Sequence, residues 1–215
     1  MRTFSFPVAS AASIAVLPFS DMSPAQDQEY FSDGLSEQLI NDLAKVSGLK
    51  VIARSSAFQF KRKNEDLREV GRKLGVANVL VGNVRREGNH VHITAELIKA
   101  DDGFQLWSQT YDREVKDIFA VQDDIALAAT EALQVKLLEG NGQPVASDQR
   151  SANPEAYQAF LQAEYFLGRG QSKEDLSKAL AYIAKLCSLM LLLTRRSSSM
   201  RNMDQPGPCV RRCRI

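Results

Sequence analysis

The sequence predicts an α/β domain, built on one mixed β-sheet packed by helices, followed by an α-helical hairpin. Two observations carry this prediction. Between residues 13 and 138, short apolar runs and amphipathic helical patterns follow one another in the order βαβαβββα, which favours a mixed sheet covered by helices. A purely helical pattern with an aromatic and small-residue face then begins near Asn153.

The first part of the domain is expected to be parallel. Residues 13–19 read SIAVLPF, a continuous apolar run that indicates a central strand covered on both faces. Residues 32–46 carry an apolar stripe at helical spacing, and we expect Gly48 to cap that helix. Residues 49–53 predict the next strand, and a strand–helix–strand order favours a parallel pair.

The second part is expected to be antiparallel. Residues 66–74 predict a helix that ends at a glycine, and three strand candidates with turn signals between them follow at 79–85, 91–98 and 104–111. The middle candidate alternates apolar and polar residues, which indicates one solvent-facing side. A helix over residues 117–138 closes the domain. Its expected buried residues are Val121, Ile125, Ala128, Ala129, Ala132 and Leu133.

Composition divides the chain into five parts. Residues 1–12 are expected to be a disordered lead-in, residues 13–138 the α/β domain, and residues 139–152 a linker. Residues 153–185 predict the helix hairpin, with Asn153 as the N-cap, and such a hairpin is the unit of a helical solenoid. Residues 186–215 are expected to be an aberrant basic tail without fixed structure.

Charge and cysteine are concentrated at the end of the chain. The formal net charge is +1, which gives no global indication of nucleic acid or a membrane surface. From residue 186 onward there are six arginines, one acid and all three cysteines. The longest apolar run, residues 189–193, is far below the ~20 residues that span a bilayer. We therefore expect no membrane insertion by this chain and a cytoplasmic location, or a periplasmic one if an upstream membrane helix exists in a parent protein.

Several segments together resemble the TolB N-terminal-like domain of bacterial regulatory proteins. The segments are SIAVLPF, EYFSDGLSEQL (29–39), LKVIARSSAF (49–58), GVANVLVGNVR (75–85) and LWSQTYDRE (106–114). The resemblance implies a fold related to the α/β domain of TolB. It also implies a position between an upstream effector and downstream tetratricopeptide repeats, the first of which residues 153–185 resemble. The effector in such proteins is often a class III adenylate or guanylate cyclase domain, or a winged-helix DNA-binding domain.

The resemblance leads to three expectations about function. The first is a non-catalytic regulatory or protein-interaction module of a bacterial signalling protein, with a protein partner and no cofactor. The second is a C-terminal fragment of a class III cyclase that lacks the catalytic domain, and the third is a truncated winged-helix regulator. In each case the chain itself is expected not to be an enzyme. The departure from the repeat pattern after Lys185 suggests, as a hypothesis, a frameshifted end.

The candidate chemical groups are few, and each has a structural interpretation. His90 and His92 share one strand face and could share a metal, but no cysteine lies near them. Cys187, Cys209 and Cys213 lack a fourth ligand. The acid pairs point apart, which favours solvated faces over a clamp. These pairs are Asp101 with Asp102 and Asp123 with Asp124, and Asp112, Arg113 and Glu114 form a short charged run. The sequence therefore predicts no catalytic, cofactor-binding or metal site.

Basic and aromatic residues complete the candidates. Residues 61–63 read KRK and residues 85–86 read RR, which is too little for a nucleic-acid interface. Trp107 and Tyr111 predict either core packing against a helix or a binding platform on the sheet. No glycine-rich phosphate loop or nucleophile elbow occurs in the sequence.

Overall fold

A computed structural model describes residues 12–25, 27–63, 65–133, 153–169 and 172–201. The chain divides into two compact units, residues 1–152 and residues 153–215. Most of the expected lead-in, the whole expected linker and the last fourteen residues lie outside the described part.

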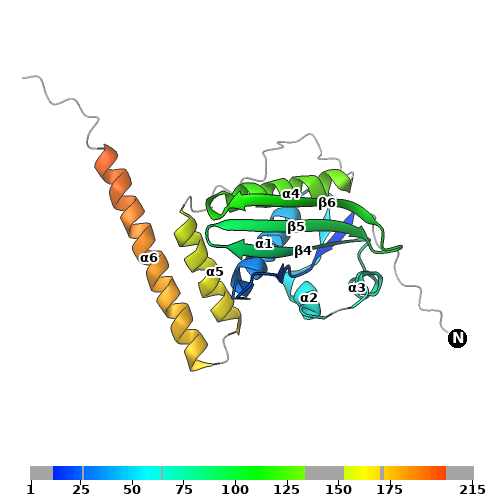
Figure 1. Cartoon of the computed structure of the whole chain (residues 1–215), viewed down its shortest axis with the longest axis horizontal. Helices are drawn as coiled ribbons and strands as arrows, with labels where there is room; N and C mark the ends of the chain where they lie inside the picture. Colours follow the sequence, from blue (N-terminus) through cyan, green and yellow to red (C-terminus); the bar gives the residue numbers. More distant parts are fainter. Residues whose placement is uncertain (1–11, 26, 64, 134–152, 170–171, 202–215) are drawn as a thin grey trace, which may run out of the picture. The chain divides into compact units, whose positions relative to one another are not determined.

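The first unit contains a mixed sheet with the strand order β3-β1-β4-β5-β6 (Figure 1). β1 pairs in parallel with both β3 and β4, and the β4–β5 and β5–β6 pairs are antiparallel. A two-residue strand, β2, also pairs in parallel with β4. The strands are β1 (Ser13–Val16), β2 (Ser20–Asp21), β3 (Lys50–Val51), β4 (Asn78–Glu87), β5 (His90–Lys99) and β6 (Gln105–Glu114). The expected mixed α/β sheet is confirmed.

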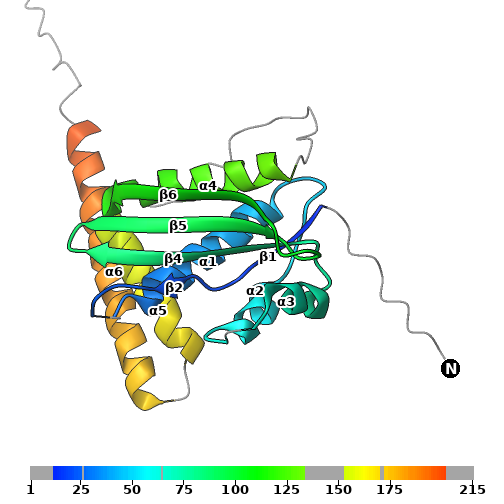
Figure 2. The same ribbon diagram turned by 45° about the vertical axis from the view of Figure 1, so that its right-hand side comes forward.

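Helices cover both faces of the parallel part of this sheet (Figure 2). Ala15 and Leu17 on one face pack in a buried cluster with Ala57 of α2 and Val70 of α3. The alternate residues of β1 point to the other face, where α1 and α4 lie together. The helical segments are α1 (Glu29–Ala44), α2 (Arg54–Ala57), η1 (Phe58–Phe60), α3 (Leu67–Leu74), η2 (Val115–Asp117) and α4 (Ile118–Ala132). The order of elements therefore contains short segments beyond βαβαβββα.

Burial follows the expected strand patterns. All four residues of β1 are buried, as a central strand requires. In β5 the residues Val91, Ile93, Ala95 and Leu97 are fully buried, and the polar residues between them are not, which confirms one solvent-facing side. Ile98, expected on that side, is also buried. On α4, Val121, Ile125 and Ala129 are buried, but Ala128, Ala132 and Leu133 are only partly so.

The predicted glycine cap is confirmed for α3 and is wrong for α1. Asp66 accepts a hydrogen bond from the Arg68 N–H at the start of α3, and Gly75 ends it with a left-handed φ of 68°. α1 instead begins at Glu29, earlier than the expected residue 32, and ends at Ala44 with Lys45 as its cap. Gly48, with φ of 83°, serves the tight turn into β3 and does not cap the helix.

The second unit consists of α5 (Pro154–Arg169) and α6 (Lys173–Arg201), packed against each other as a helical hairpin. The Asn153 side chain accepts from the backbone N–H of Glu155 at 2.9 Å, so the expected N-cap is present. The rings of Phe166 and Tyr182 stack across the hairpin, with their centroids 5.8 Å apart.

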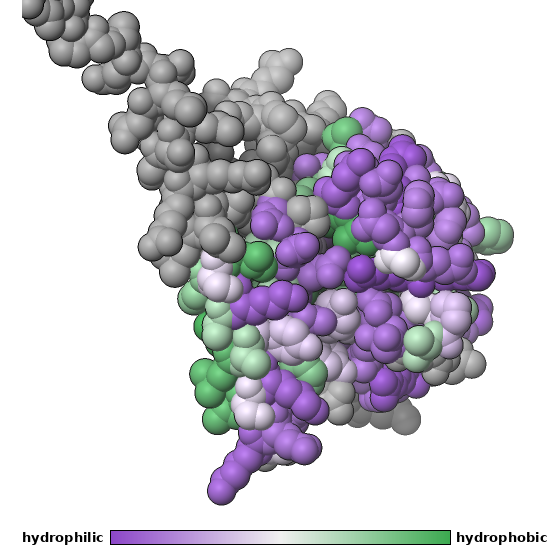
Figure 3. Space-filling view, turned by 60° about the vertical axis from the view of Figure 1, so that its left-hand side comes forward, coloured by the Kyte–Doolittle hydropathy of each residue, from purple (hydrophilic) through white to green (hydrophobic). Residues whose placement is uncertain are grey.

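The expected disordered tail is wrong for residues 186–201, because α6 continues through them as a helix. Leucine, methionine and arginine are good helix formers, and the first proline that could stop the helix is Pro206. Figure 3 shows apolar surface gathered along the described side chains of α6. Leu176 and Leu180 of α6 are 51% and 59% exposed. Within the described residues, no helix is both long enough and apolar enough to cross a membrane.

Candidate functional site

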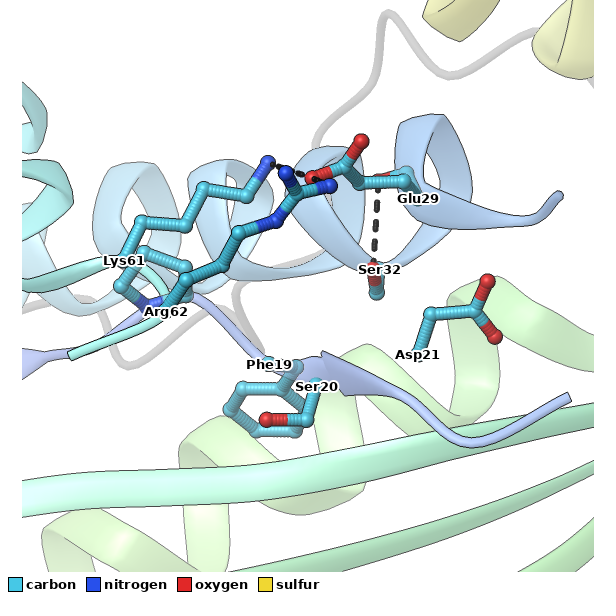
Figure 4. Close-up of a pocket in the computed structure, with 8 residues that line it drawn as sticks. Phe19, Ser20, Asp21, Glu29, Ser32, Lys61 and Arg62 are labelled. Atoms are coloured by element: carbon cyan, nitrogen blue, oxygen red, sulfur yellow. Dashed lines mark hydrogen bonds and ion pairs between the residues drawn. The ribbon is translucent and has the colours of Figure 1, made fainter. Parts of the chain in front are cut away.

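A pocket of about 430 Å³ opens beyond the carboxyl end of β1, where the chain leaves the sheet and turns into α1. Its side chains come from three segments: the stretch that contains β2, the first turns of α1, and the loop after η1 (Figure 4). The lining residues are Pro18, Phe19, Ser20, Asp21, Glu29, Ser32, Lys61 and Arg62.

The topology of the sheet explains this position. β1 has β3 as its parallel neighbour on one side and β4 on the other. After β1 the chain therefore continues to β3 on one side of β1. After β3 it crosses to β4 on the other side of β1. In open parallel sheets, ligands bind outside the carboxyl ends of strands at such a switch point. The loops that follow β1 and β3 are the ones that line this pocket.

Lys61 joins the two sides of the pocket. Its Nζ atom lies 2.8 Å from Glu29 Oε1 and 2.5 Å from Asp33 Oδ2. The Arg62 Nη2 atom lies 2.7 Å from the same Glu29 oxygen. Glu29 and Asp33 are four residues apart on α1 and share one face of the helix. The loop after η1 therefore brings two cations against two carboxylates of α1.

Asp33 is the most buried acid of this group. Its side chain is 9% exposed, and its Oδ1 atom has no hydrogen-bond partner within the described structure. Burial raises the pKa of Asp33, and the hydrogen bond and charge of Lys61 act in the opposite direction. Lys61 is thus the main group that stabilises the ionised form of Asp33.

Hydrogen bonds hold the wall of the pocket in place. The Phe19 N–H donates to Ser36 Oγ at 2.8 Å, and the Ser36 hydroxyl donates to the Ser32 carbonyl at 2.8 Å. The Gln28 N–H donates to Asp21 Oδ2 at 2.8 Å. These bonds tie the segment after β1 to the start of α1.

The arrangement is suited to noncovalent binding of a polar ligand. Lys61 and Arg62 approach from one side, and the Asp21 carboxylate lies on the other (Figure 4), so the pocket presents charges of both signs. Within the described residues, no group of three or more His, Cys, Asp or Glu side chains could hold a metal ion.

The two histidines lie away from the pocket, on β5. His90 is exposed, and the Nδ1 atom of His92 lies 3.4 Å from Asp112 Oδ2 across the β5–β6 ladder. His92 thus contacts one acid on the neighbouring strand. Glu114, from the same charged run as Asp112, pairs with Lys116 at 2.9 Å.

The two acid pairs have separate surroundings. Asp102 accepts from the Phe104 N–H and from Lys99 Nζ, each at 3.0 Å, and these bonds lower the pKa of Asp102. Asp101 lies 3.8 Å from the same lysine. Asp123 and Asp124 lie on α4. The structure brings neither pair to the pocket.

The remaining candidates divide between surface and core. Lys63 lies over the Phe60 ring, and Arg86 donates to the Gln28 side chain at 3.2 Å. Tyr111 is buried, with 4% exposure, so it packs in the core. Cys187 is an exposed free cysteine of α6, and the other two cysteines lie outside the described residues.

The sequence had given no indication of the pocket itself. In the sequence, Lys61 and Arg62 stand out only as part of the basic cluster KRK. Asp33 lies in the helix predicted over residues 32–46, and Glu29 lies just before it, but neither acid is among the candidate site residues of the sequence. The usable signal was the pair of acids four residues apart at the start of a largely buried helix, since such acids require partners.

Comparison with known protein families gives a match over most of the first unit. Residues 10–128, which are more than half of the chain, match the model of the HilA/YgeH-like transcriptional regulator, second domain. The chain belongs to this family. The HilA/YgeH-like domain contains the sheet, the pocket and most of α4.

A curated relative with a different name matches the same chain. The "Putative adenylate cyclase 3" of Rhizobium meliloti (strain 1021) is 48% identical over 151 residues, which are 70% of this chain and 26% of that protein. The chain thus spans about a quarter of the length of this relative.

Solved structures show partial likeness at low identity. TolB from Acinetobacter baumannii is 15% identical, with a TM-score of 0.43 over 58% of this chain and 28% of that chain. Lipoprotein GNA1162 from Neisseria meningitidis is 23% identical, with a TM-score of 0.41 over 48% and 80%. The LpoB C-terminal domain from Salmonella enterica is 16% identical, with a TM-score of 0.39 over 50% and 86%.

Proposed function

We propose that the HilA/YgeH-like domain of this chain is a non-catalytic control module of a bacterial signalling protein. One observation carries the proposal. Residues 10–128 match the second domain of a transcriptional-regulator family, and 151 residues of the chain match part of a protein named as an adenylate cyclase, so the two matches overlap in this chain of 215 residues. One of these names refers to transcriptional regulation and the other to synthesis of cyclic AMP, and we call such an activity the output of the protein. A domain shared by proteins with different outputs supports a role in controlling an output rather than producing one.

The pocket supports binding as the way in which control is exerted. It lies at the switch point of the sheet, and its lining includes charged side chains of both signs. A ligand or partner group that exchanges with the Glu29 ion pairs would change how α1 is tied to the loop after η1. In this proposal, that change is passed to the output domain.

The helical hairpin is proposed as the beginning of a tetratricopeptide-like solenoid. α5 and α6 pack as a pair, and α6 leaves Leu176 and Leu180 exposed. A hairpin with an exposed apolar face is what a further repeat would cover. The whole chain would then combine a sensing domain with a protein-binding array.

The parent protein could be a transcriptional regulator or an adenylate cyclase, and the 48% identity to the Rhizobium protein named as a cyclase favours the second. In this reading the chain corresponds to a part of such a protein that lies outside its catalytic domain, and it acts in the cytoplasm. The proposal predicts that the chain alone does not make cyclic AMP.

A direct assay tests the absence of catalysis. The purified chain is incubated with ATP and either Mg²⁺ or Mn²⁺, and cyclic AMP is measured beside the full-length Rhizobium relative. We expect no product above the buffer level from the chain. Product formation that is lost when Glu29→Gln and Asp33→Asn are introduced would overturn the proposal, since it would place catalysis in the pocket.

A further inference from the structure

One side of the pocket, residues 19–21 around β2, carries hydrogen-bond acceptors, and we call it the β2 wall. The Met22 N–H donates to the Val84 carbonyl of β4 at 2.8 Å. Because N–H and C=O groups alternate in direction along a strand, the N–H and C=O of Asp21 and the carbonyl of Phe19 point away from β4. Both residues line the pocket. Within the described residues, no hydrogen bond reaches these three backbone groups.

The Asp21 side chain adds acceptor capacity to the β2 wall. Its Oδ1 atom accepts from the Ser23 N–H at 2.9 Å, and its Oδ2 atom accepts from the Gln28 N–H at 2.8 Å. An ionised carboxylate has about four acceptor sites, so these bonds fix the side chain and leave about two sites. The described ion pairs at the pocket involve Glu29 and Asp33, and none includes Asp21. The β2 wall is therefore suited to a cationic donor such as an ammonium group.

Arg62 is the exchangeable cation on the opposite side. Its Nη2 atom lies 2.7 Å from Glu29 Oε1, and its side chain is 79% exposed. Lys61 Nζ lies 2.8 Å from the same oxygen, so Glu29 keeps a cation when Arg62 turns to another carboxylate. An exposed ion pair contributes little to stability. A carboxylate from a ligand can thus take the place of Glu29 beside Arg62 without leaving a buried charge unpaired.

The backbone of Arg62 has an uncommon conformation. Its φ of 60° lies in the left-handed region, which residues other than glycine rarely adopt. Such a conformation costs energy and occurs most often at ligand-binding and switch segments. Figure 4 shows the Arg62 side chain extending along the pocket toward Glu29. The loop thus holds the guanidinium group at the pocket.

We propose that the pocket binds a small zwitterion of the amino-acid type, with its ammonium group on the β2 wall and its carboxylate on Arg62. This inference names the ligand of the control site and so rests on the proposed function. A simple anion would use only Arg62 and a simple cation only the β2 wall, whereas a zwitterion uses both. The charged lining residues are Asp21, Glu29, Lys61 and Arg62, so a ligand without net charge keeps the balance. The volume of about 430 Å³ is in the range of small-molecule sites.

The test is an NMR titration of the isotope-labelled full chain with glycine, β-alanine, γ-aminobutyrate and ε-aminocaproate at constant ionic strength. The series separates the ammonium and carboxylate groups by increasing distances, so it measures the spacing between the β2 wall and Arg62. We expect one length to bind best, with saturable shifts centred on the amides of Ser20, Asp21 and Arg62. The contacts are few, so the titrations extend to about 50 mM. If no member of the series shifts these amides, the proposal is overturned.

Ligands that lack one charge test whether both sides of the pocket are used. Acetate carries only the carboxylate, and ethylammonium carries only the ammonium group. The N-acetyl form of the best amino acid keeps its size and loses its positive charge. Each should bind at least about tenfold more weakly than the best amino acid, because one charge-assisted contact is missing. Equal binding of acetate would show a simple anion site, and equal binding of ethylammonium a simple cation site, and either result contradicts the proposal.

Arg62→Gly tests the carboxylate contact in a folded chain. Glycine adopts a φ of 60° without strain, so the melting temperature should not fall. We expect the affinity for the best amino acid to fall by about tenfold or more. The matched control is Lys63→Gln, which removes the neighbouring exposed charge outside the pocket lining and should leave the affinity unchanged. If Arg62→Gly binds as tightly as the parent, the carboxylate does not lie on Arg62 and the proposal is wrong.

The ligand class and the control function can fail separately. The titrations use this chain alone, without an output domain. If no amino acid binds but Glu29→Gln changes cyclic AMP synthesis in a cyclase that carries this domain, the ligand class is wrong and the control function stands. If the best amino acid binds at Asp21 and Arg62 but neither it nor Glu29→Gln affects cyclic AMP synthesis, the ligand class is supported and the control function is contradicted.

Discussion

Replacement of Lys61 by methionine is expected to destabilise the α/β domain strongly at neutral pH. Lys61 is the shared partner of Glu29 and Asp33, and the Asp33 side chain is only 9% exposed. Removing one member of a buried ion pair costs about 3–5 kcal/mol. Lys61 is itself 25% exposed, so solvent screening reduces the expected loss to about 2–3 kcal/mol. For a domain of this size, that corresponds to a melting temperature lower by about 10 °C.

The loss should depend on pH in a defined direction. Burial already raises the pKa of Asp33 in the folded state, and Lys61 opposes that rise. Without Lys61, the folded-state pKa of Asp33 rises further above its unfolded value. The folded variant then binds a proton more tightly than the unfolded chain does. Destabilisation is therefore complete at pH values above the raised pKa and decreases as the pH falls through it.

The assay is urea unfolding of the parent and the Lys61→Met variant at several pH values between neutral and mildly acidic. Lys116→Met serves as the matched control, because Lys116 pairs with Glu114 on the surface and its loss should leave the unfolding midpoint within experimental error. Adding Asp33→Asn to Lys61→Met should recover much of the stability, since no buried charge then remains. The reasoning is refuted if Lys61→Met behaves like Lys116→Met, or if its effect is the same at every pH.

Three further changes test the packing and the extent of the domain. Leu39→Asp places an unpaired carboxylate at a fully buried position of α1. Because this costs several kcal/mol, circular dichroism should show an unfolded domain. A melting temperature near that of the parent would contradict the burial of Leu39. Gly82→Ala would put a Cβ atom 2.4 Å from both the Phe19 ring and the Thr94 carbonyl oxygen. We therefore expect the free energy of unfolding in urea to fall by at least about 2 kcal/mol. An unchanged unfolding midpoint would show that Phe19 in the pocket wall moves to make room. A chain that ends at Gly140 should be more soluble and melt at nearly the parent temperature, because the α/β domain has its own core; a much lower melting temperature would show that the second unit contributes to that core.

Elements with a local cause were predictable from the sequence. The start and end of α3 depend on Asp66 and Gly75, whose effects reach only across one helical turn. The alternation in β5 follows directly from burial of one side of the sheet. Such features need no knowledge of distant residues.

Features that depend on distant contacts were missed. The first turn of α1 begins at Glu29, whose ion pairs with Lys61 and Arg62 come from a loop far along the chain. The pocket likewise requires that the loops after β1 and β3 meet, which only the strand order reveals. The continuation of α6 to Arg201 was missed for another reason. The composition of that segment is irregular, but the helix propensity of its leucine, methionine and arginine residues favours a helix.

The central claim is that the HilA/YgeH-like domain controls an output without producing it. The most direct measurement is the cyclic AMP level in a host without its own cyclase that expresses the Rhizobium relative, with the matching 151-residue segment replaced by the corresponding part of this chain. The account predicts that the chimera makes cyclic AMP, and that a Glu29→Gln substitution in the pocket changes the level several-fold while Lys116→Met does not. If deletion of the whole segment leaves the level unchanged and Glu29→Gln has no effect, the domain does not control that output and the claim is contradicted.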